Sequence, residues 1–350
     1  MQKYLFHPFK TNQKALFCLF ILTFLTLSWA CKDKSDSVPE INFLNVSFDP
    51  TRELYAEINT EFGKLWSLNH KSTISFQQSH GGSGKQARSV IDGLQADVVT
   101  LALSYDIDSI VEKSGLISKD WESKFPNNSS PYFSTVVLLV RKGNPKNIRD
   151  WDDIIKDSVS IITPNPKTSG GARWNYLAAY AYAKEKTKSN DKAKEFISKL
   201  YKNTSVLDTG ARASTTTFIQ RSMGDVLITW ENEALLALKE SNTKEKNFEI
   251  IYPSVSILAE TPVAIVEVNA KKKQTLDIAT SYIEFLYSEQ GQEIIAKNFL
   301  RPRSEVILQK YKNQFPKIKM VSIRDLEGSW KEAQLKHFSD NGIFDQIYKK

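Results

Sequence analysis

The chain has 350 residues, of which 41% are hydrophobic, 11% aromatic and 25% charged, and its formal net charge is +7. These are ordinary values for a folded protein of roughly two domains, and 14 glycines and 12 prolines are too few for a collagen-like or low-complexity chain. The small, scattered basic excess argues against a nucleic-acid partner, and two cysteines exclude a disulfide framework or a four-cysteine zinc site.

The first thirty residues have the pattern of an export signal. The basic residues Lys3, Lys10 and Lys14 precede a run of almost wholly apolar residues, 15–27. This run is too short to span a membrane as a helix and is typical of the hydrophobic part of a signal peptide. We therefore predict that residues 1–30 are a signal peptide that is removed from the mature protein.

A cysteine, Cys31, follows the predicted signal peptide directly after the small residue Ala30. A cysteine at this position is typical of a bacterial lipoprotein, although Leu27 lies one residue further upstream than usual. We expect Cys31 to carry diacylglycerol, so that a lipid alone anchors a periplasmic protein to a membrane. The alternatives are simple secretion after cleavage and an uncleaved N-terminal membrane anchor. The polar residues 31–40 predict a tether after the anchor.

Four segments in chain order each combine a short strand with a helix. In the first, residues 43–47 predict a buried strand, and the apolar face of the helix that follows comprises Leu54, Ile58, Phe62 and Leu65. In the second, residues 73–77 predict a strand, and the apolar face of its helix comprises Ala87, Val90, Ile91 and Leu94.

The third and fourth segments repeat this pattern further along the chain. Residues 159–163 predict a strand followed by a helix to about residue 186, and residues 206–207 predict a strand followed by a helix through Phe218. Strands that alternate with helices indicate βαβ units and a largely parallel sheet. The predicted fold class is therefore α/β.

The turns between these strands and helices carry capping residues or glycines, as in the run from Ser79 to Gly84. Ligands of parallel sheets bind at the carboxyl ends of strands, where helix N-termini offer unpaired N–H groups and a partial positive charge. Glycine lets a ligand approach that backbone closely. The four turns together predict an anion-binding site, and the alternative is that they are ordinary loops that need only a cap or a glycine.

Motifs typical of enzymes fail in this sequence. Ser79 stands where a phosphate-binding Walker loop ending at Gly84-Lys85 needs its first glycine, and Lys85 interrupts a nucleophile elbow around Ser83. The histidines of the mature chain are dispersed, and we expect His80 to brace its loop, with a catalytic role as the alternative. We therefore expect no catalytic residue, no cofactor and no metal.

Long segments at and beyond these turns carry a family resemblance. They include NVSFDPTRELY (45–55), QSHGGSGKQA (78–87), ITPNPKTSGGARWNYLAA (162–179), LDTGARASTTTF (207–218) and GDVLITWENEALLALKE (224–240). They resemble the bacterial periplasmic sulfate-binding protein family, the receptors of sulfate and thiosulfate ABC importers. The resemblance covers about residues 41–350.

The resemblance implies a two-lobed, type II periplasmic binding protein fold. In this fold each lobe is a central sheet flanked by helices, and the ligand lies in the cleft between the lobes. We expect lobe 1 to comprise residues 41–135 and 256–310, and lobe 2 to comprise residues 136–255. We expect residues 311–350 to form a C-terminal segment packed on the lobes.

The resemblance also implies a set of sulfate-binding residues. Asp49 and Ala211 would give their backbone N–H groups, Ser83 its hydroxyl and Trp230 its indole N–H. Further donors, mainly backbone, would come from a predicted helix start at Ser169, Gly170 and Gly171. Arg173 would brace the site, with Asp49 as a candidate partner, without contacting the anion.

Each of these residues also has a purely structural interpretation. Asp49 and Ser169 are common helix caps, Trp230 suits a buried core, and Arg173 suits a surface ion pair. Lys85 and Lys167 flank the turns, where they would either steer an anion inward or be solvated loop charges.

The sequence thus predicts a monomeric receptor that binds sulfate, or thiosulfate, and delivers it to an ABC transporter permease. Two other classes of protein stay open. One is a secreted enzyme that acts on sulfate or phosphate esters. The other is a surface lipoprotein with the same fold that recognises another oxyanion or a macromolecular partner.

Overall fold

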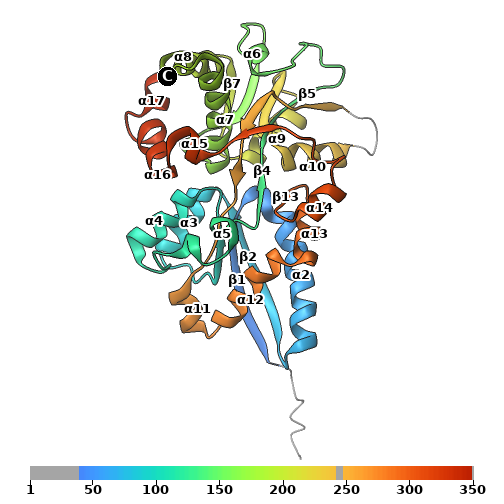
Figure 1. The fold of residues 1–350 in the computed structure, drawn as a ribbon, viewed down its shortest axis with the longest axis vertical. Helices are drawn as coiled ribbons and strands as arrows, with labels where there is room; N and C mark the ends of the chain where they lie inside the picture. The colour runs from blue at the N-terminus through green and yellow to red at the C-terminus, as the bar shows by residue number, and fades with distance from the viewer. Residues whose placement is uncertain (1–38, 242–246, 349–350) are drawn as a thin grey trace, which may run out of the picture. The chain divides into compact units, whose positions relative to one another are not determined.

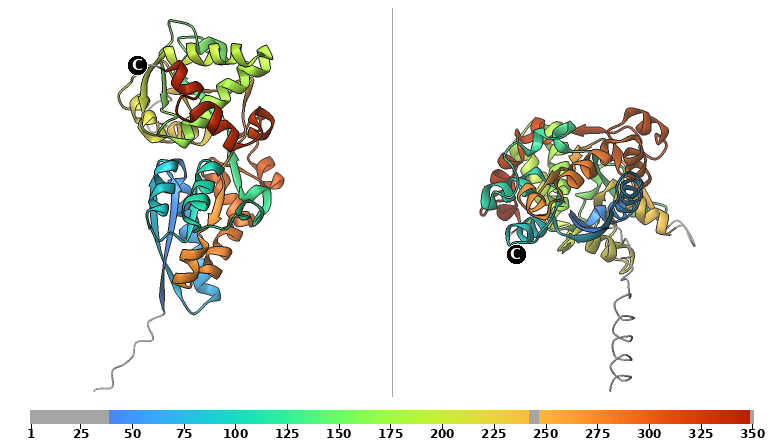
Figure 2. Two further views of the ribbon diagram at one scale, coloured as in Figure 1. Left: turned by 90° about the vertical axis from the view of Figure 1, so that its left-hand side faces the viewer. Right: turned by 90° about the horizontal axis from the view of Figure 1, so that it is seen from below.

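The computed structural model describes residues 39–241 and 247–348, so the predicted signal peptide and Cys31 lie outside the described residues. Residues Glu40–Lys350 form one compact unit. The described part of this unit has two lobes, each built on a sheet with helices on its faces (Figures 1 and 2). The predicted α/β fold class is therefore confirmed.

Lobe 1 contains a four-stranded sheet in the order β12-β3-β1-β2. Its strands are β1 (Glu40–Phe48), β2 (Thr73–Gly81), β3 (Val98–Thr100) and β12 (Val263–Ile265). Strands β2 and β3 run parallel to β1, and β12 is antiparallel to β3. The helices of this lobe are α2 (Arg52–Asn69), α3 (Ser83–Ile91), α4 (Ser104–Ser114), α11 (Glu267–Lys273), α12 (Leu276–Tyr287) and α13 (Glu289–Lys297).

Both faces of the lobe 1 sheet are covered because side chains of a strand alternate between its faces. Phe43 of β1 packs with residues of α2, α12 and α13, whereas Val46 packs with residues of α3 and α4. Residues 43–47 include the polar residues Asn45 and Ser47, and both are buried with hydrogen-bond partners, Tyr282 and His80.

Two details of the predicted helix faces are wrong. Leu65 is 40% exposed, and Trp66, whose Nε1 donates to Ser72 Oγ over 2.9 Å, is the buried residue at that turn of α2. Leu94 lies beyond α3, which ends at Ile91. Gly93 adopts a φ of 110°, a left-handed conformation that does not continue a helix.

Lobe 2 contains a five-stranded sheet in the order β7-β6-β8-β5-β9. Its strands are β5 (Val136–Arg141), β6 (Ile161–Pro164), β7 (Thr204–Asp208), β8 (Val226–Trp230) and β9 (Phe248–Ile251). Its helices are α6 (Trp151–Ile154), α7 (Gly170–Thr187), α8 (Asn190–Lys202), α9 (Ala211–Ile219) and α10 (Glu231–Ser241). The predicted parallel pairing holds for β6, β7 and β8, whereas β5 is antiparallel to both β8 and β9.

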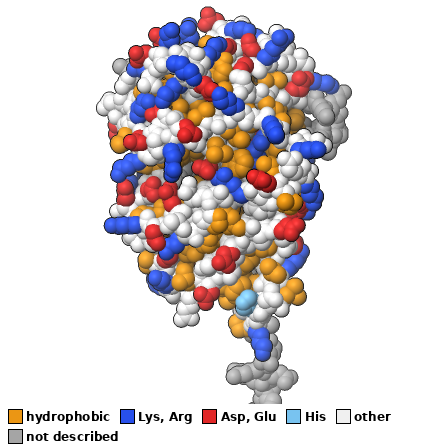
Figure 3. All heavy atoms as spheres, viewed as in Figure 1, with side chains coloured by type: hydrophobic (Ala, Val, Ile, Leu, Met, Phe, Trp, Pro, Cys, Tyr) orange, Lys and Arg blue, Asp and Glu red, His pale blue; other side chains and the backbone are white. Residues whose placement is uncertain are grey.

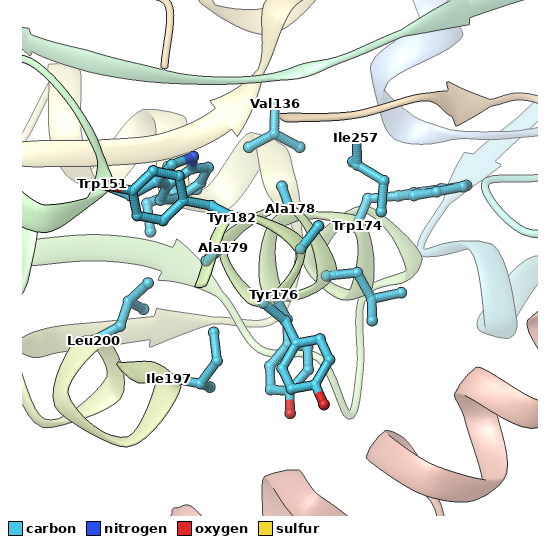
Figure 4. Packing of buried hydrophobic residues seen from close by; sticks show 14 of the residues in the cluster. Val136, Trp151, Trp174, Tyr176, Ala178, Ala179, Tyr182, Ile197, Leu200 and Ile257 are labelled. Carbon is cyan, nitrogen blue, oxygen red and sulfur yellow. The ribbon is translucent and has the colours of Figure 1, made fainter. Parts of the chain in front are cut away.

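Helix α7 is the centre of the lobe 2 core, as Figure 4 shows. Its side chains Trp174, Tyr176 and Tyr180 are fully or almost fully buried, and Ala178 and Ala179 lie between them. Small alanines let the sheet and α8 approach the helix closely, so α7 is packed on all sides. Close packing of this kind fixes the position of the N-terminus of α7.

Short strands connect the two lobes. A three-stranded antiparallel sheet in the order β11-β4-β13 is formed by β4 (Tyr132–Ser134), β11 (Ala259–Glu260) and β13 (Arg301–Pro302). A second pair is parallel and consists of β10 (Val255–Ile257) and β14 (Lys319–Val321). These strands lie close to the predicted crossings of the chain, and the exact boundaries at residues 135, 255 and 310 stay predictions.

Short elements complete the described chain. They are η2 (Asp49–Thr51), η3 (Trp121–Ser123), α5 (Pro126–Ser129), α14 (Glu305–Lys310), α15 (Ile323–Glu327), α16 (Trp330–Ala333), η4 (Gln334–Phe338) and α17 (Ile343–Ile347). The last four belong to the C-terminal segment, which lies beside α7 and α8 in Figure 1. Its apolar side chains, among them Trp330, Phe338 and Phe344, belong to the same core as α7.

The visible surface mixes charges of both signs. Figure 3 shows Lys and Arg side chains interspersed with Asp and Glu over that face, without a broad basic area. Among the described residues, no helix combines the length and the apolar character needed to cross a membrane.

A buried ion pair joins the strands between the lobes to lobe 2. Arg301 of β13 contacts Glu231, the first residue of α10, through Nε–Oε2 and Nη2–Oε1 distances of 2.6 and 2.8 Å. The two side chains are only 4% and 0% exposed. Burial raises the pKa of Glu231, and the guanidinium of Arg301 opposes that rise.

Arg301→Met is expected to lower the free energy of unfolding by about 3–5 kcal/mol, because it leaves the buried carboxylate of Glu231 without its cationic partner and with only the hydroxyl of Tyr252 to donate to it. Denaturant unfolding measures this loss. Lys310→Met is the matched control, since Lys310 pairs with Glu293 at 2.8 Å but is 62% exposed, and its loss is expected to be at most about 1 kcal/mol. Equal, small losses for the two variants would contradict the structural role of the buried pair.

Candidate functional site

Four helical segments begin at the carboxyl ends of the predicted strands. Asp49 starts η2 directly after β1, and Ser83 starts α3 two residues after β2. Gly170 starts α7 after β6, and Ala211 starts α9 after β7. The two lobes therefore each contribute two helix starts, at the edge of the sheets where ligands of α/β proteins bind.

The helix starts of the two lobes touch one another. A methyl group built on Gly170 would lie 3.0 Å from the Cβ atoms of both Ser83 and Ala102, which belong to lobe 1. A methyl group on Gly82 would lie 3.2 Å from the carbonyl oxygen of Thr168. The lack of side chains at Gly170 and Gly82 is thus what lets the backbones of α3 and α7 approach.

These helix starts expose backbone donors. The first amides of a helix have no acceptor within the helix. Among the described residues, the amides of Ser83, Gly170, Gly171 and Ala211 donate to no protein acceptor. The dipoles of their helices add partial positive charge at the same place. The arrangement suits an anion that accepts hydrogen bonds.

Trp230 and Ser169 both lie next to Gly171. Trp230 ends β8, is 1% exposed, and its Nε1 donates to the carbonyl oxygen of Gly171 over 3.2 Å. The hydroxyl of Ser169 caps α7 by accepting from the amide of Ala172 over 3.3 Å, which leaves the hydroxyl proton available to another acceptor. A hydroxyl with an available proton thus lies beside the free amides of α7, together with an indole N–H that in this structure donates to Gly171 and would have to exchange that acceptor for an anion.

The predicted role of the Ser83 hydroxyl stays a prediction, because in this structure the hydroxyl contacts only protein groups. Ser83 Oγ donates to Asp106 Oδ2 over 2.5 Å and accepts from the amide of Ala102 over 2.9 Å. A hydroxyl can donate only one hydrogen bond, and here Asp106 accepts it. Burial raises the pKa of Asp106, while the charge of Arg173 and this hydrogen bond act in the opposite direction. In this structure the side chain of Ser83 therefore positions α3, and its backbone amide is free.

The partner proposed for Arg173, Asp49, is wrong. Asp49 pairs with Arg52, at 3.6 Å between Oδ1 and Nη2, and not with Arg173. The Nε of Arg173 donates to the carbonyl oxygen of Pro166 over 3.0 Å, in the loop that precedes α7. Arg173 is thus placed where it braces that loop.

His80 is engaged through both ring nitrogens. Nδ1 lies 2.7 Å from Ser47 Oγ, and Nε2 lies 2.6 Å from Gln78 Oε1. Burial lowers the pKa of His80. These contacts favour the loop-bracing interpretation over a catalytic one.

A cleft of about 640 Å³ opens beside the helix starts. Its lining includes Asp49 and the cationic residues Lys85, Arg88, Lys167 and Arg173. Lys85 and Arg88 are exposed and lie one turn apart on α3. The cleft is therefore predominantly cationic, which favours the entry of an anion.

A cluster of charges beside the site was missed by sequence reasoning. The guanidinium of Arg212 contacts Glu53 Oε2 at 3.1 Å and Glu233 Oε1 at 3.0 Å. Because Glu53 lies in α2 and Arg212 in α9, this cluster joins the two lobes. The three residues are far apart in the sequence, and no local pattern pairs them before the fold is known.

The described residues contain no group of three or more histidine, cysteine or acidic side chains placed to hold a metal ion.

Comparisons with known proteins identify the family of the chain. A family model described as bacterial extracellular solute-binding protein matches residues 49–301. The sulfate-binding protein of Escherichia coli (strain K12) is 54% identical over 330 residues, which cover 94% of this chain and 98% of that protein. A thiosulfate-binding protein of Pseudomonas aeruginosa is 49% identical over 305 residues, which cover 87% and 91%.

A solved structure has the same fold. The sulfate-binding protein SubI from Mycobacterium tuberculosis H37Rv superposes with a TM-score of 0.76 at 30% identity, covering 85% of this chain and 100% of that chain. The chain therefore belongs to the bacterial extracellular solute-binding proteins, and among them to the periplasmic sulfate-binding protein family. The family resemblance of the sequence is thus confirmed.

Glu233→Gln is expected to flatten the pH dependence of stability. Burial raises the pKa of Glu233 from 4.5 to about 7, although Arg212 acts against the rise. The folded chain therefore holds this proton more tightly than the unfolded chain. The contribution of Glu233 to the free energy of unfolding is full below about pH 4.5 and falls, by at most about 3 kcal/mol, as the pH rises to about 7.

Denaturant unfolding of the wild type and Glu233→Gln at about pH 4.5 and about pH 7 measures this contribution. Thr216→Ser is the control, because it lies at a half-buried position of α9 and keeps the hydroxyl that donates to the carbonyl oxygen of Arg212. The same change of stability with pH in wild type and Glu233→Gln would contradict the assignment.

Proposed function

We propose that the protein is an extracytoplasmic receptor that binds sulfate, or thiosulfate, and delivers it to an ABC importer. The sulfate- and thiosulfate-binding relatives support this function, and so does the chemistry of the site. The observation that carries the proposal is the convergence of free amides from the starts of α3, α7 and α9 beside the indole of Trp230 and the hydroxyl of Ser169.

Every group assigned to the ligand is a hydrogen-bond donor. We assign the backbone amides of five residues, together with the Ser169 hydroxyl and the Trp230 indole, to the anion. The five residues are Asp49, Ser83, Gly170, Gly171 and Ala211. Sulfate is fully deprotonated at neutral pH and offers only acceptors, so a site of donors matches it. Tryptophan suits this role because its N–H can only donate.

The two carboxylates near the site are not among the assigned groups, and each contacts another side chain. Asp106 accepts the hydroxyl proton of Ser83, and Asp49 pairs with Arg52. Phosphate at neutral pH carries at least one proton, which would need an acceptor of this kind. An unpaired, desolvated donor costs roughly 1–3 kcal/mol, so the site would reject phosphate by leaving its proton unsatisfied.

Helix dipoles and hydrogen bonds would offset most of the cost of burying a dianion. Arg173 lies in the neighbourhood of the site, but its Nε donates to the carbonyl oxygen of Pro166. A site without a direct guanidinium or ammonium contact would release its anion readily, which a receptor that feeds a transporter needs.

The remaining parts of the proposal concern location and partners. We propose that the receptor is periplasmic, is a monomer, is anchored through a lipid on Cys31, and catalyses no reaction. The sequence before residue 39 supports export and lipidation, and the relatives are binding proteins rather than enzymes. Mass spectrometry of the membrane-associated protein tests the lipid, since it would show Cys31 as a diacylated N-terminal residue.

Trp230→Phe is expected to weaken sulfate binding by about 1–3 kcal/mol, because it removes a buried donor and keeps the aromatic packing against Phe48. Isothermal titration of the mature chain (residues 32–350) measures the change. Trp151→Phe is the matched control, because Trp151 is equally buried but donates to the carbonyl oxygen of Val255, away from the site. Unchanged affinity for Trp230→Phe would overturn the assignment of the indole.

Phosphate is expected to bind about tenfold to hundredfold more weakly than sulfate at neutral pH, because its proton finds no acceptor. Titration of sulfate in the presence of excess phosphate measures this discrimination. Displacement of sulfate by equimolar phosphate would rule out the all-donor site. Binding of no oxyanion at all would instead favour a lipoprotein that recognises a macromolecular partner.

A further inference from the structure

Lys167 lines the cleft, but its ammonium contacts the C-terminal segment. Its Nζ lies 2.8 Å from Asp345 Oδ1 and 2.9 Å from Oδ2. It also contacts the carbonyl oxygens of Phe338 at 3.2 Å and Ser339 at 3.4 Å. An ammonium has three donors, and these contacts occupy them. Lys167 is thus committed to the protein, which disfavours the idea that it steers an anion inward.

Lys167 belongs to the loop that sets up α7. In this loop the amides of Lys167, Thr168 and Ser169 donate to Asn165, to its side chain in one case and to its carbonyl oxygen in the others. Gly170 follows directly. Any shift of the loop would therefore move the free amides of Gly170 and Gly171.

A second cation from the same region packs on the same part of the C-terminal segment. The guanidinium carbon of Arg173 lies 5.6 Å from the ring centroid of Phe338. Phe338 is 3% exposed, and its ring packs edge-on against Tyr176 of α7 at 5.0 Å between centroids. Phe338 is also a source of a carbonyl oxygen for Lys167, so one residue contacts the loop from two sides.

The C-terminal segment is itself firmly attached to α7. His337 is fully buried in the π-helical turn η4, and its Nδ1 lies 3.0 Å from the hydroxyl of Tyr176. Glu327 is paired with Lys184 of α7 and with Lys336 and His337 of the segment, at 4.0, 2.8 and 3.2 Å. Isolated π-helical turns recur at functional positions of proteins.

We infer that the C-terminal segment is a positioning element for the anion site, in which Asp345 and the carbonyl oxygens of η4 hold Lys167 and so preset the free amides at the start of α7. Asp345 and Lys167 are positioning residues that do not touch the ligand. The inference rests on the proposed function, because it assigns those amides to sulfate. Presetting a loop strengthens binding by reducing the order that the ligand must impose.

Asp345→Asn in the mature chain tests the inference, with Asp340→Asn as the matched control. Asp340 belongs to the same segment and lies 3.9 Å from Lys167, but its side chain is fully exposed. Titration with sulfate is expected to give a dissociation constant about three- to tenfold higher for Asp345→Asn and an unchanged one for Asp340→Asn. An unchanged dissociation constant for Asp345→Asn would overturn the inference.

A double-mutant cycle separates positioning from a general structural effect. If Asp345 acts through Lys167, the double variant Asp345→Asn, Lys167→Met is expected to bind sulfate no more weakly than Lys167→Met alone. Asp345→Glu, which keeps the charge, is expected to recover most of the affinity. Additive losses, or failure of Asp345→Glu to recover affinity, would contradict the proposed link.

Hydrogen–deuterium exchange without sulfate provides a readout that does not depend on the proposed ligand. The amides of residues 167–169 are expected to exchange several-fold faster in Asp345→Asn than in Asp340→Asn, because their loop has lost its anchor. If the wild type binds no sulfate but these amides still exchange faster in Asp345→Asn than in Asp340→Asn, the anchor is supported and only the proposed function is overturned. Equal exchange in the two variants would overturn the anchor.

Discussion

An α-helix cannot satisfy the amides of its own first turn, and in this protein four helical segments direct that deficit to one place. The long α7 contributes most, because it is packed on all sides and its first residues are the glycines Gly170 and Gly171. The helices α3 and α9 and the short η2 complete the arrangement. A cluster of fixed donors without a protein acceptor is stable only where an anion or water accepts from it, which ties the fold to an anion-binding function.

The same donors require that the two lobes come together. Gly170 approaches Ser83 so closely that a methyl group would strain the contact, and Phe48 of lobe 1 packs on Trp230 of lobe 2. Arg212 adds a charged link between the lobes through Glu53 and Glu233. These contacts lie at the rim of the donor cluster. The binding site is therefore complete only when the two lobes are in contact.

The sequence predicted the elements that form this cluster because each strand-to-helix unit has a local pattern. The apolar period of α2 and the capping residues near Ser169 are legible without a structure. Other features are not local. Leu65 was misplaced because Trp66 fills the space at that turn, and β5 runs antiparallel to both of its neighbours, β8 and β9. The sequence could not reveal that Asp106, 23 residues away, would accept the hydrogen bond of the Ser83 hydroxyl.

A crystal structure of the mature chain with sulfate tests the central claim most directly. The account predicts one sulfate between the lobes, with its oxygens within hydrogen-bonding distance of the amides at the starts of η2, α3, α7 and α9, and of Trp230 Nε1. It also predicts that Ser83 Oγ stays bonded to Asp106. A sulfate bound by the guanidinium of Arg88 or Arg173 in the outer cleft, away from those amides, would contradict it.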